Sequence, residues 1–193
     1  MKRIIIVFLA LIFVVPLVAQ DRSKFLYAEF ADQSATLWPF YKPFGGNFDP
    51  ALSLGYGFDL KAKEHSAKFL AFQLTGYKTA LIGQGFNLTS SYGYRYTKSG
   101  LLAEASIGLG VVAYFDVRET FTHNDEGIYT SANPIHFAAS LPVDILAGYD
   151  FGVVSLYIKF RYMVIGPYTE VMPVLPNSLL GLGIRYNINS SGE

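Results

Sequence analysis

The sequence contains no cysteine, little charge and a single tryptophan among its 193 residues. Without cysteine, disulfide bonds are excluded, and no thiol is available for lipid attachment at an export site. Charged residues make up only 16% of the chain, and 15 basic residues balance 15 acidic ones. This balance argues against a nucleic-acid partner, because such a partner calls for a basic face. The length suits one domain.

Apolar and aromatic residues are abundant instead. They contribute 51% and 16% of the chain, with 14 tyrosines and 16 phenylalanines. A soluble domain this apolar usually shows long stripes of leucine and alanine at helical spacing, and the sequence has none. A β-structure is therefore expected.

The N-terminus has the pattern of an export signal. Lys2 and Arg3 precede an apolar run over residues 4–18, and Ala19 is followed by a polar residue. A basic head, an apolar core and a small residue before a polar one are typical of a secretory signal peptide. An uncleaved anchor helix is the alternative, but the run is short of the roughly 20 residues that span a bilayer. We expect a signal peptide over residues 1–19 and one barrel domain over residues 20–193.

Beyond the signal, apolar residues recur at every second position, which is the period of a β-strand. In the second run, for example, Leu52 and Leu54 alternate with Ser53 and Gly55. Runs of ten or so residues suit strands that cross a bilayer at a tilt. The sequence predicts eight such strands, at residues 25–36, 51–61, 68–78, 86–97, 101–115, 135–149, 153–164 and 179–188.

Two barrel types share this alternation. A soluble barrel of the lipocalin type turns its apolar faces inward, whereas a membrane barrel turns them outward. The polar faces of these runs are dominated by glycine, serine, threonine, alanine and asparagine, with one or two charges per strand. Such small residues suit the crowded interior of a narrow barrel, and no charged surface is left to face water. An all-β, eight-stranded antiparallel up-and-down transmembrane barrel is predicted.

The links between the runs are short and long in alternation. Residues 62–67, 98–100 and 150–152 form short links, whereas residues 38–50, 116–134 and 165–178 form long ones; residues 79–85 break the contrast. Outer-membrane barrels have short periplasmic turns and long extracellular loops. The three long links are thus the expected sites for an extracellular ligand or protein partner.

Each strand that runs toward the short turns carries glycine followed by an outward aromatic or apolar residue. Tyr56, Tyr94, Tyr149 and Tyr186 belong to these repeats and would lie at the inner headgroup level.

The chain resembles the small eight-stranded outer-membrane barrels, such as the OmpA transmembrane domain and OmpX-type proteins, over residues 25–188. The resemblance rests on architecture and on the ending of the last strand, residues 180–186. One departure is that Ile188 is followed by five further residues, whereas the last strand in that class often ends on an aromatic residue.

One strand carries the residue types of a hydrolase triad, His136, Ser140 and Asp144. Positions four apart on a strand are separated by roughly 13 Å, far outside hydrogen-bond reach, so we expect these side chains to line the barrel. The His-x-Ser pair carried by barrel enzymes that deacylate lipid A is absent. Pro142 lies between these residues and is expected to mark a bulge, because proline cannot donate to the ladder.

Seven charged residues are predicted to share the barrel interior. Unpaired charges in a narrow lumen cost several kcal/mol or more, so the sequence predicts a salt-bridge network that plugs the barrel. A gated ion path is the alternative. The predicted members are Glu29, Arg95, Glu104, Asp144, Lys159, Arg161 and Arg185.

No metal or cofactor site is expected. The acidic residues Asp116, Glu119, Asp125 and Glu126 have no calcium-loop spacing and are interpreted as solvated. The sequence therefore favours a barrel whose structural or surface-interaction role is carried by its loops, with outer-membrane lipids and lipopolysaccharide as its surroundings. A barrel enzyme that modifies lipid A or lipopolysaccharide, and a soluble periplasmic carrier of the lipocalin type, remain the alternatives.

Overall fold

The computed structural model describes residues 23–34, 48–79, 83–115, 121–123, 129–131, 135–167 and 174–188. The predicted signal peptide, residues 1–19, lies outside them, as do the four acidic residues of the link 116–134. Within the described residues, no helix has the length and hydropathy needed to span a membrane.

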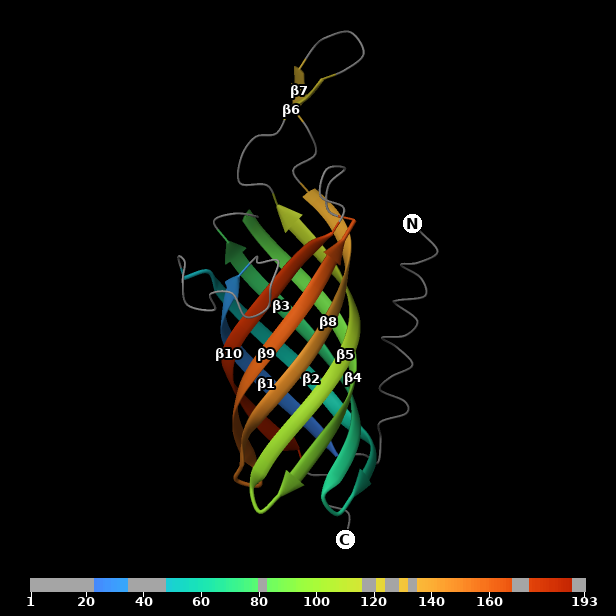
Figure 1. Ribbon diagram of the computed structural model, residues 1–193, viewed down its shortest axis with the longest axis vertical. Coiled ribbons are helices and arrows are strands. Elements are labelled where there is room, and N and C mark those ends of the chain that lie inside the picture. Colours follow the sequence, from blue (N-terminus) through green and yellow to red (C-terminus); the bar gives the residue numbers. More distant parts are fainter. Residues whose placement is uncertain are drawn as a thin grey trace.

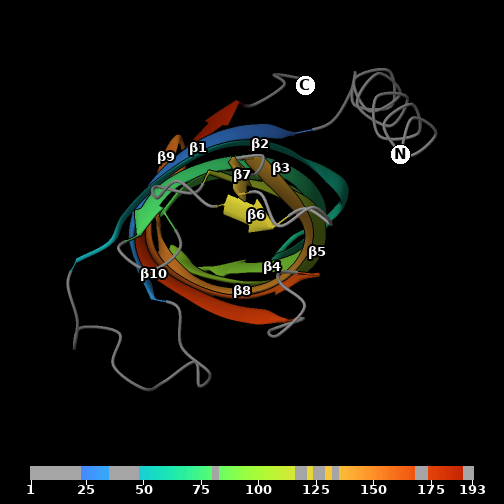
Figure 2. The same cartoon turned by 90° about the horizontal axis from the view of Figure 1, so that it is seen from above.

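Eight antiparallel strands close into a barrel (Figure 1), in the order β1-β10-β9-β8-β5-β4-β3-β2. The first and last strands pair directly, and the ring is complete when it is viewed along its axis (Figure 2). The predicted eight-stranded up-and-down architecture is confirmed. The barrel strands are β1 (Lys24–Ser34), β2 (Pro50–Lys63), β3 (Ser66–Thr79), β4 (Gly83–Lys98), β5 (Leu101–Phe115), β8 (Ile135–Asp150), β9 (Val154–Gly166) and β10 (Leu175–Ile188).

The apolar faces of the strands point outward and the polar faces point into the lumen. On β10, Leu182 is 66% exposed, whereas Arg185 is 3% exposed. The same alternation runs along β5, where Leu109 is exposed and Glu104 is buried. Period-2 patterning therefore places an apolar belt around the outside of the barrel and a polar column along its axis.

The two ends of the barrel differ. At the turn end, Glu64 and His65 join β2 to β3, and Ser99 and Gly100 join β4 to β5. Ser99 and Gly100 have φ values of 51° and 82°, as a two-residue type I′ hairpin requires. At the loop end, the link between β5 and β8 contains a small hairpin that the sequence did not predict, and Figure 1 shows it beyond the rim. Its strands are β6 (Phe121–His123) and β7 (Tyr129–Ser131).

Several boundaries differ from those predicted. β10 begins at Leu175, four residues before the predicted strand, and β9 extends to Gly166, so the link 165–178 is shorter than expected. Pro142 does not add a residue to its strand, because Ile107↔Val143 and Gly110↔Ser140 keep one register on both sides of it. The expected bulge is therefore wrong at Pro142: the β5–β8 ladder lacks two residue pairs there but does not slip.

Inward glycines make room for inward aromatic rings on neighbouring strands. A Cβ atom at Gly55 would overlap the ring of Tyr27, and one at Gly57 would overlap the ring of Phe25. The register places each glycine directly opposite its aromatic partner on β1. Large side chains can thus lie flat against the barrel wall, which leaves space along the axis for the charged groups.

Candidate functional site: the lumen of the barrel

All seven residues predicted for the lumenal network lie on inward-facing strand positions. Arg95 is half-buried, and the other six are buried. Together with Gln73 and Asp59, they form two groups at different heights in the barrel. We call them the middle cluster (Glu29, Asp144, Lys159, Arg161 and Gln73) and the turn-end cluster (Asp59, Arg95, Glu104 and Arg185).

The middle cluster is built on the cross-strand pair Asp144 and Arg161. The two residues are register partners on β8 and β9, and Arg161 donates from Nε and Nη2 to the two carboxylate oxygens at 2.6 and 2.7 Å. This is the bidentate geometry in which guanidinium–carboxylate pairs are strongest. Ser106, the register partner of Asp144 on β5, adds a hydrogen bond of 3.3 Å.

Glu29 provides the second carboxylate of the middle cluster. Its Oε1 accepts a hydrogen bond of 2.7 Å from Lys159 Nζ, and its Oε2 accepts one of 2.9 Å from Gln73 Nε2. Gln73 Oε1 in turn accepts from Lys159 and from Arg161, at 3.0 and 2.7 Å. The amide thus links the two ion pairs, because it can donate to one group while it accepts from two others.

The turn-end cluster is organised around Glu104. Arg95 is its register partner on β4 and donates to it through Nε. Arg185 reaches it from β10 across the lumen with two hydrogen bonds, of 2.5 and 2.7 Å. Arg95 also binds Asp59, with Nη1 at 3.0 Å from Oδ1. Two acids and two bases therefore form a continuous chain of ion pairs.

An aromatic ring supports both guanidinium groups of the turn-end cluster. The centre of the Phe25 ring lies 4.5 Å from the guanidinium carbon of Arg95 and 4.6 Å from that of Arg185. Phe69 lies under Arg95 at 5.2 Å, and Tyr157 lies under Arg185 at 5.5 Å. Planar guanidinium groups stack well on aromatic faces, so these arginines are held by rings as well as by carboxylates.

The two clusters are each neutral when ionised. The middle cluster contains two acids and two bases, and the turn-end cluster contains the same. Removing one partner of a buried pair typically costs about 3–5 kcal/mol, because the other charge is left unpaired. The equal numbers of acids and bases indicate that these side chains are ionised and that each charge in the lumen is stabilised by a partner of opposite sign.

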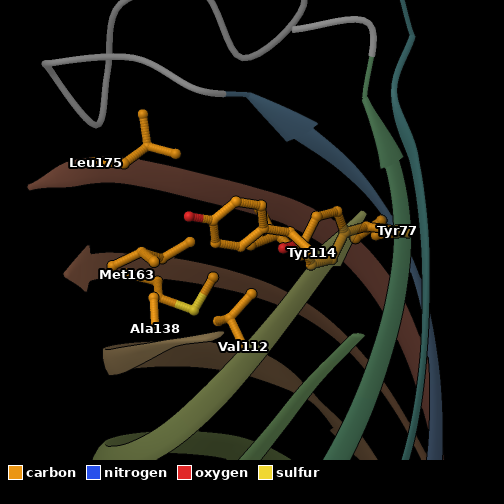
Figure 3. Packing of buried hydrophobic residues seen from close by; sticks show 10 residues of the cluster. Tyr77, Val112, Tyr114, Ala138, Met163 and Leu175 are labelled. Carbon is orange, nitrogen blue, oxygen red and sulfur yellow. The ribbon is translucent and has the colours of Figure 1, made fainter. Parts of the chain in front are cut away.

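Apolar side chains close the lumen at the loop end (Figure 3). Tyr77, Val112, Tyr114, Met163 and Leu175 come from four strands and pack together inside the barrel. Between the clusters below them, the packing leaves a cavity of about 30 Å³, which is room for one or two water molecules. A wider vestibule of about 230 Å³ opens at the turn end, lined by Asp59, Arg95 and Arg185 among others.

The three residue types of a hydrolase triad are each engaged elsewhere. Ser140 donates to Asn87 Oδ1 at 3.0 Å, and Asp144 binds Arg161. The His136 ring stacks on Tyr114 with their centroids 5.1 Å apart. Because a nucleophile and its base must be in hydrogen-bond contact, these three residues form no nucleophilic site.

Asp59, Gln73 and Tyr157 are among the participants that were not predicted as members of the network. All three occupy the polar faces of their alternating runs, and that is the only signal that the sequence carries for them. Their partners depend on how the strands are staggered around the ring, which alternation alone does not specify. Tyr157, for example, donates to Glu29 from the far side of β10.

Comparisons with known proteins agree with this architecture. No protein-family model matches the sequence, and no curated protein matches it either. Solved structures do match. The chain has the fold of the small outer-membrane barrels. Neisserial surface protein A (NspA) aligns with a TM-score of 0.57 and 15% identity, over 88% of this chain and 98% of that one.

Two further structures align similarly. The N-terminal β-barrel domain of Pseudomonas aeruginosa OprF gives a TM-score of 0.56 at 14% identity, over 86% of this chain and 97% of that one. The outer membrane enzyme PagL gives 0.51 at 13% identity, over 85% and 99%. At these identities the similarities establish the fold and nothing finer.

Proposed function

We propose that this protein is an outer-membrane barrel of a diderm bacterium, with a structural or surface-interaction role carried by its extracellular loops. The observation that carries the proposal is the inverted arrangement of the barrel. Leu109 and Leu182 are each 66% exposed on its outer face, whereas Glu29, Glu104 and Asp144 are buried inside it. Hydrocarbon is the solvent that such an outer face fits.

A soluble carrier of the lipocalin type fits poorly. Its apolar faces would line a ligand cavity, and its charged faces would meet water. Here the space between the two clusters is a cavity of about 30 Å³ among charged and aromatic side chains. This volume is far below the roughly 300–1,000 Å³ of a small-molecule site.

The lumen also supports a closed barrel in preference to a pore. Ion pairs fill its middle and turn end, and an apolar layer fills its loop end. Eight-stranded barrels are just wide enough for side chains to fill them. Contacts with the exterior are therefore assigned to the links that follow β1, β5 and β9, and contacts with lipid and lipopolysaccharide to the apolar belt.

An enzymatic role is the weaker alternative. The fold is shared with PagL, an outer membrane enzyme, but a shared fold does not imply a shared activity. Among the described residues, His136, Ser140 and Asp144 are bound to other groups, so no hydrolase site supports that alternative.

Cell fractionation with a gel-mobility assay tests the proposal. We expect the protein in the outer-membrane fraction, extractable only with detergent, with a mobility in SDS that shifts on boiling. A soluble species without a shift would contradict the proposal. An epitope inserted within residues 124–128 should be labelled on intact cells. One inserted between Ser99 and Gly100 should be labelled only after permeabilisation.

A further inference from the structure

A β-bulge near the turn end of β2 turns a lysine to the outside of the barrel. Asp59 pairs with Phe69, both facing inward, but the next pair in the ladder is Lys61 with Lys68. Leu60 is the extra residue. With strict alternation Lys61 would follow Asp59 into the lumen, whereas the bulge places it outward beside Lys68, and both side chains are exposed.

The two lysines are directly opposite each other across β2 and β3. Side chains in this relation have Cβ atoms about 4.5–5.5 Å apart, and like charges there are destabilising. Lys24 lies nearby on β1, opposite Phe58, and Lys63 lies one step closer to the turn, opposite Ser66. We call Lys24, Lys61, Lys63 and Lys68 the lysine patch.

The nearby carboxylates do not neutralise the patch. Asp59 faces the lumen, where it binds Arg95, and Glu64 lies in the turn beside His65. Within the described part of the chain, no acidic group forms an ion pair with any of the four lysines. Counted over the described residues, the patch therefore has a net positive charge that an external anion can neutralise.

The surroundings of the patch place it at a membrane interface. Tyr94 is the register partner of Lys68, and Tyr96 is that of Ser66; both tyrosines are exposed on the outer face. Exposed tyrosines concentrate at the headgroup level of a bilayer. On the apolar side of the patch, Leu70 pairs with Tyr92, which is exposed on the outer face. A bound anion here would have headgroups around it and hydrocarbon directly above it.

We propose that the lysine patch binds the phosphate of an anionic phospholipid in the periplasmic leaflet. This rests on the proposed function, which sets the turn end in that leaflet. Two ammonium groups on neighbouring strands can share one phosphate, and each basic residue near an anionic surface contributes about 1 kcal/mol. The phosphate also relieves the repulsion between Lys61 and Lys68, so binding and local strand pairing support each other.

Native mass spectrometry of the purified full-length barrel tests the site. The protein, in detergent, is titrated with equal amounts of phosphatidylglycerol and phosphatidylcholine, and the retained lipids are counted. We expect the wild type to retain phosphatidylglycerol preferentially. The double variant Lys61→Gln and Lys68→Gln should bind it about 30-fold more weakly, which corresponds to the loss of two such charges.

Lys98→Gln is the matched control. Lys98 is an exposed lysine on the same rim, but its register partner is Leu101, and it should leave the preference unchanged. Equal retention of the two lipids by the wild type would overturn the proposal, as would an equal loss with Lys98→Gln. Displacement of the lipid by soluble glycerol phosphate would overturn it too, because the site would then take free phosphate.

Failure of the lipid site is distinguishable from failure of the proposed function. A barrel that shifts on boiling and fractionates with the outer membrane, but shows no lipid preference, overturns only the site. The same heat shift in the double variant establishes that its lost preference does not come from misfolding.

Discussion

The hydroxyl group of Tyr157 on β9 donates a hydrogen bond of 3.0 Å to Glu29 on β1, across the intervening strand β10. The residue that lies between them in the ladder is Gly183, the register partner of both. A side chain at that position would occupy the path of the tyrosine ring. Lys159, whose register partner on β10 is Gly181, also reaches Glu29 across that strand, along a diagonal. Glycines on β10 thus allow side chains of β9 and β1, which are not neighbouring strands, to contact each other.

Replacement of Gly183 by alanine should destabilise the barrel. A Cβ there overlaps the ring of Tyr157, and overpacking of this kind typically costs about 1–3 kcal/mol. Urea unfolding of the protein in phospholipid vesicles, followed by the gel-mobility shift, measures the change. Gly76→Ala is the control, because Gly76 faces outward and its new Cβ would meet only the outer ring of Phe86 at 3.3 Å. Equal effects of the two substitutions would contradict the crowding of Tyr157.

Glu104→Ala should lower the free energy of unfolding by about 3–5 kcal/mol. The substitution removes the carboxylate shared by Arg95 and Arg185 and leaves buried positive charge behind. The same unfolding assay measures it, with Glu64→Ala as the control, because the Glu64 side chain is 88% exposed in a turn. Increased single-channel conductance with unchanged stability would show that the ion pairs gate a path and do not plug the lumen.

Asp144 and Arg161 should be energetically coupled. A double-mutant cycle with Asp144→Asn and Arg161→Gln is expected to give a coupling energy of about 1–3 kcal/mol, because each single variant leaves the other charge without its bidentate partner. The unfolding free energies of the four proteins give the value. Additive effects within experimental error would mean that the pair contributes no net interaction.

The loss of stability caused by a charged residue on the outer face should depend on its depth in the membrane. Leu182→Arg places a cation in the middle of the apolar belt and should destabilise the barrel by about 2–4 kcal/mol. Leu101→Arg lies beside the Ser99–Gly100 turn and should cost about 0–1 kcal/mol, although Leu101 and Leu182 are equally exposed at 66%. The unfolding assay in vesicles compares them. If Leu101→Arg destabilised the barrel more than Leu182→Arg, the membrane would lie elsewhere on the barrel.

Alternation along the strands was sufficient to predict the fold. Residues 101–115 were predicted with the bounds that β5 has, because Ile107, Leu109 and Val111 alternate without interruption with small residues. The inward direction of Glu104 and Arg161 followed from the same parity. Strand ends were less predictable where residues typical of turns continue the ladder, as Pro176, Asn177 and Ser178 do near the start of β10. Leu175, which begins that strand, faces inward in the apolar layer at the loop end.

The alternating pattern alone could not predict which side chains contact each other inside the barrel. Parity specifies the face of Gln73, but only the stagger of the closed ring brings it between Glu29 and Arg161. The bulge at Leu60 was also unpredicted, because nothing in the local pattern marks the extra residue. A bulge shifts the alternation by one residue, so every side chain beyond it points to the opposite face. The outward direction of Lys61 therefore followed from the structure alone.

Because β1 pairs directly with β10, only the closed barrel satisfies the backbone groups of all its strands in a bilayer. Eleven residue pairs join these strands, from Lys24↔Ile188 to Ser34↔Ser178, so the last strand of the barrel satisfies the backbone of the first. A chain that lacks β10 would present the open edges of β1 and β9 to hydrocarbon, where each unsatisfied group costs several kcal/mol. Closure of the barrel therefore has to await β10, and a cell must keep the unpaired strands soluble until that strand is available.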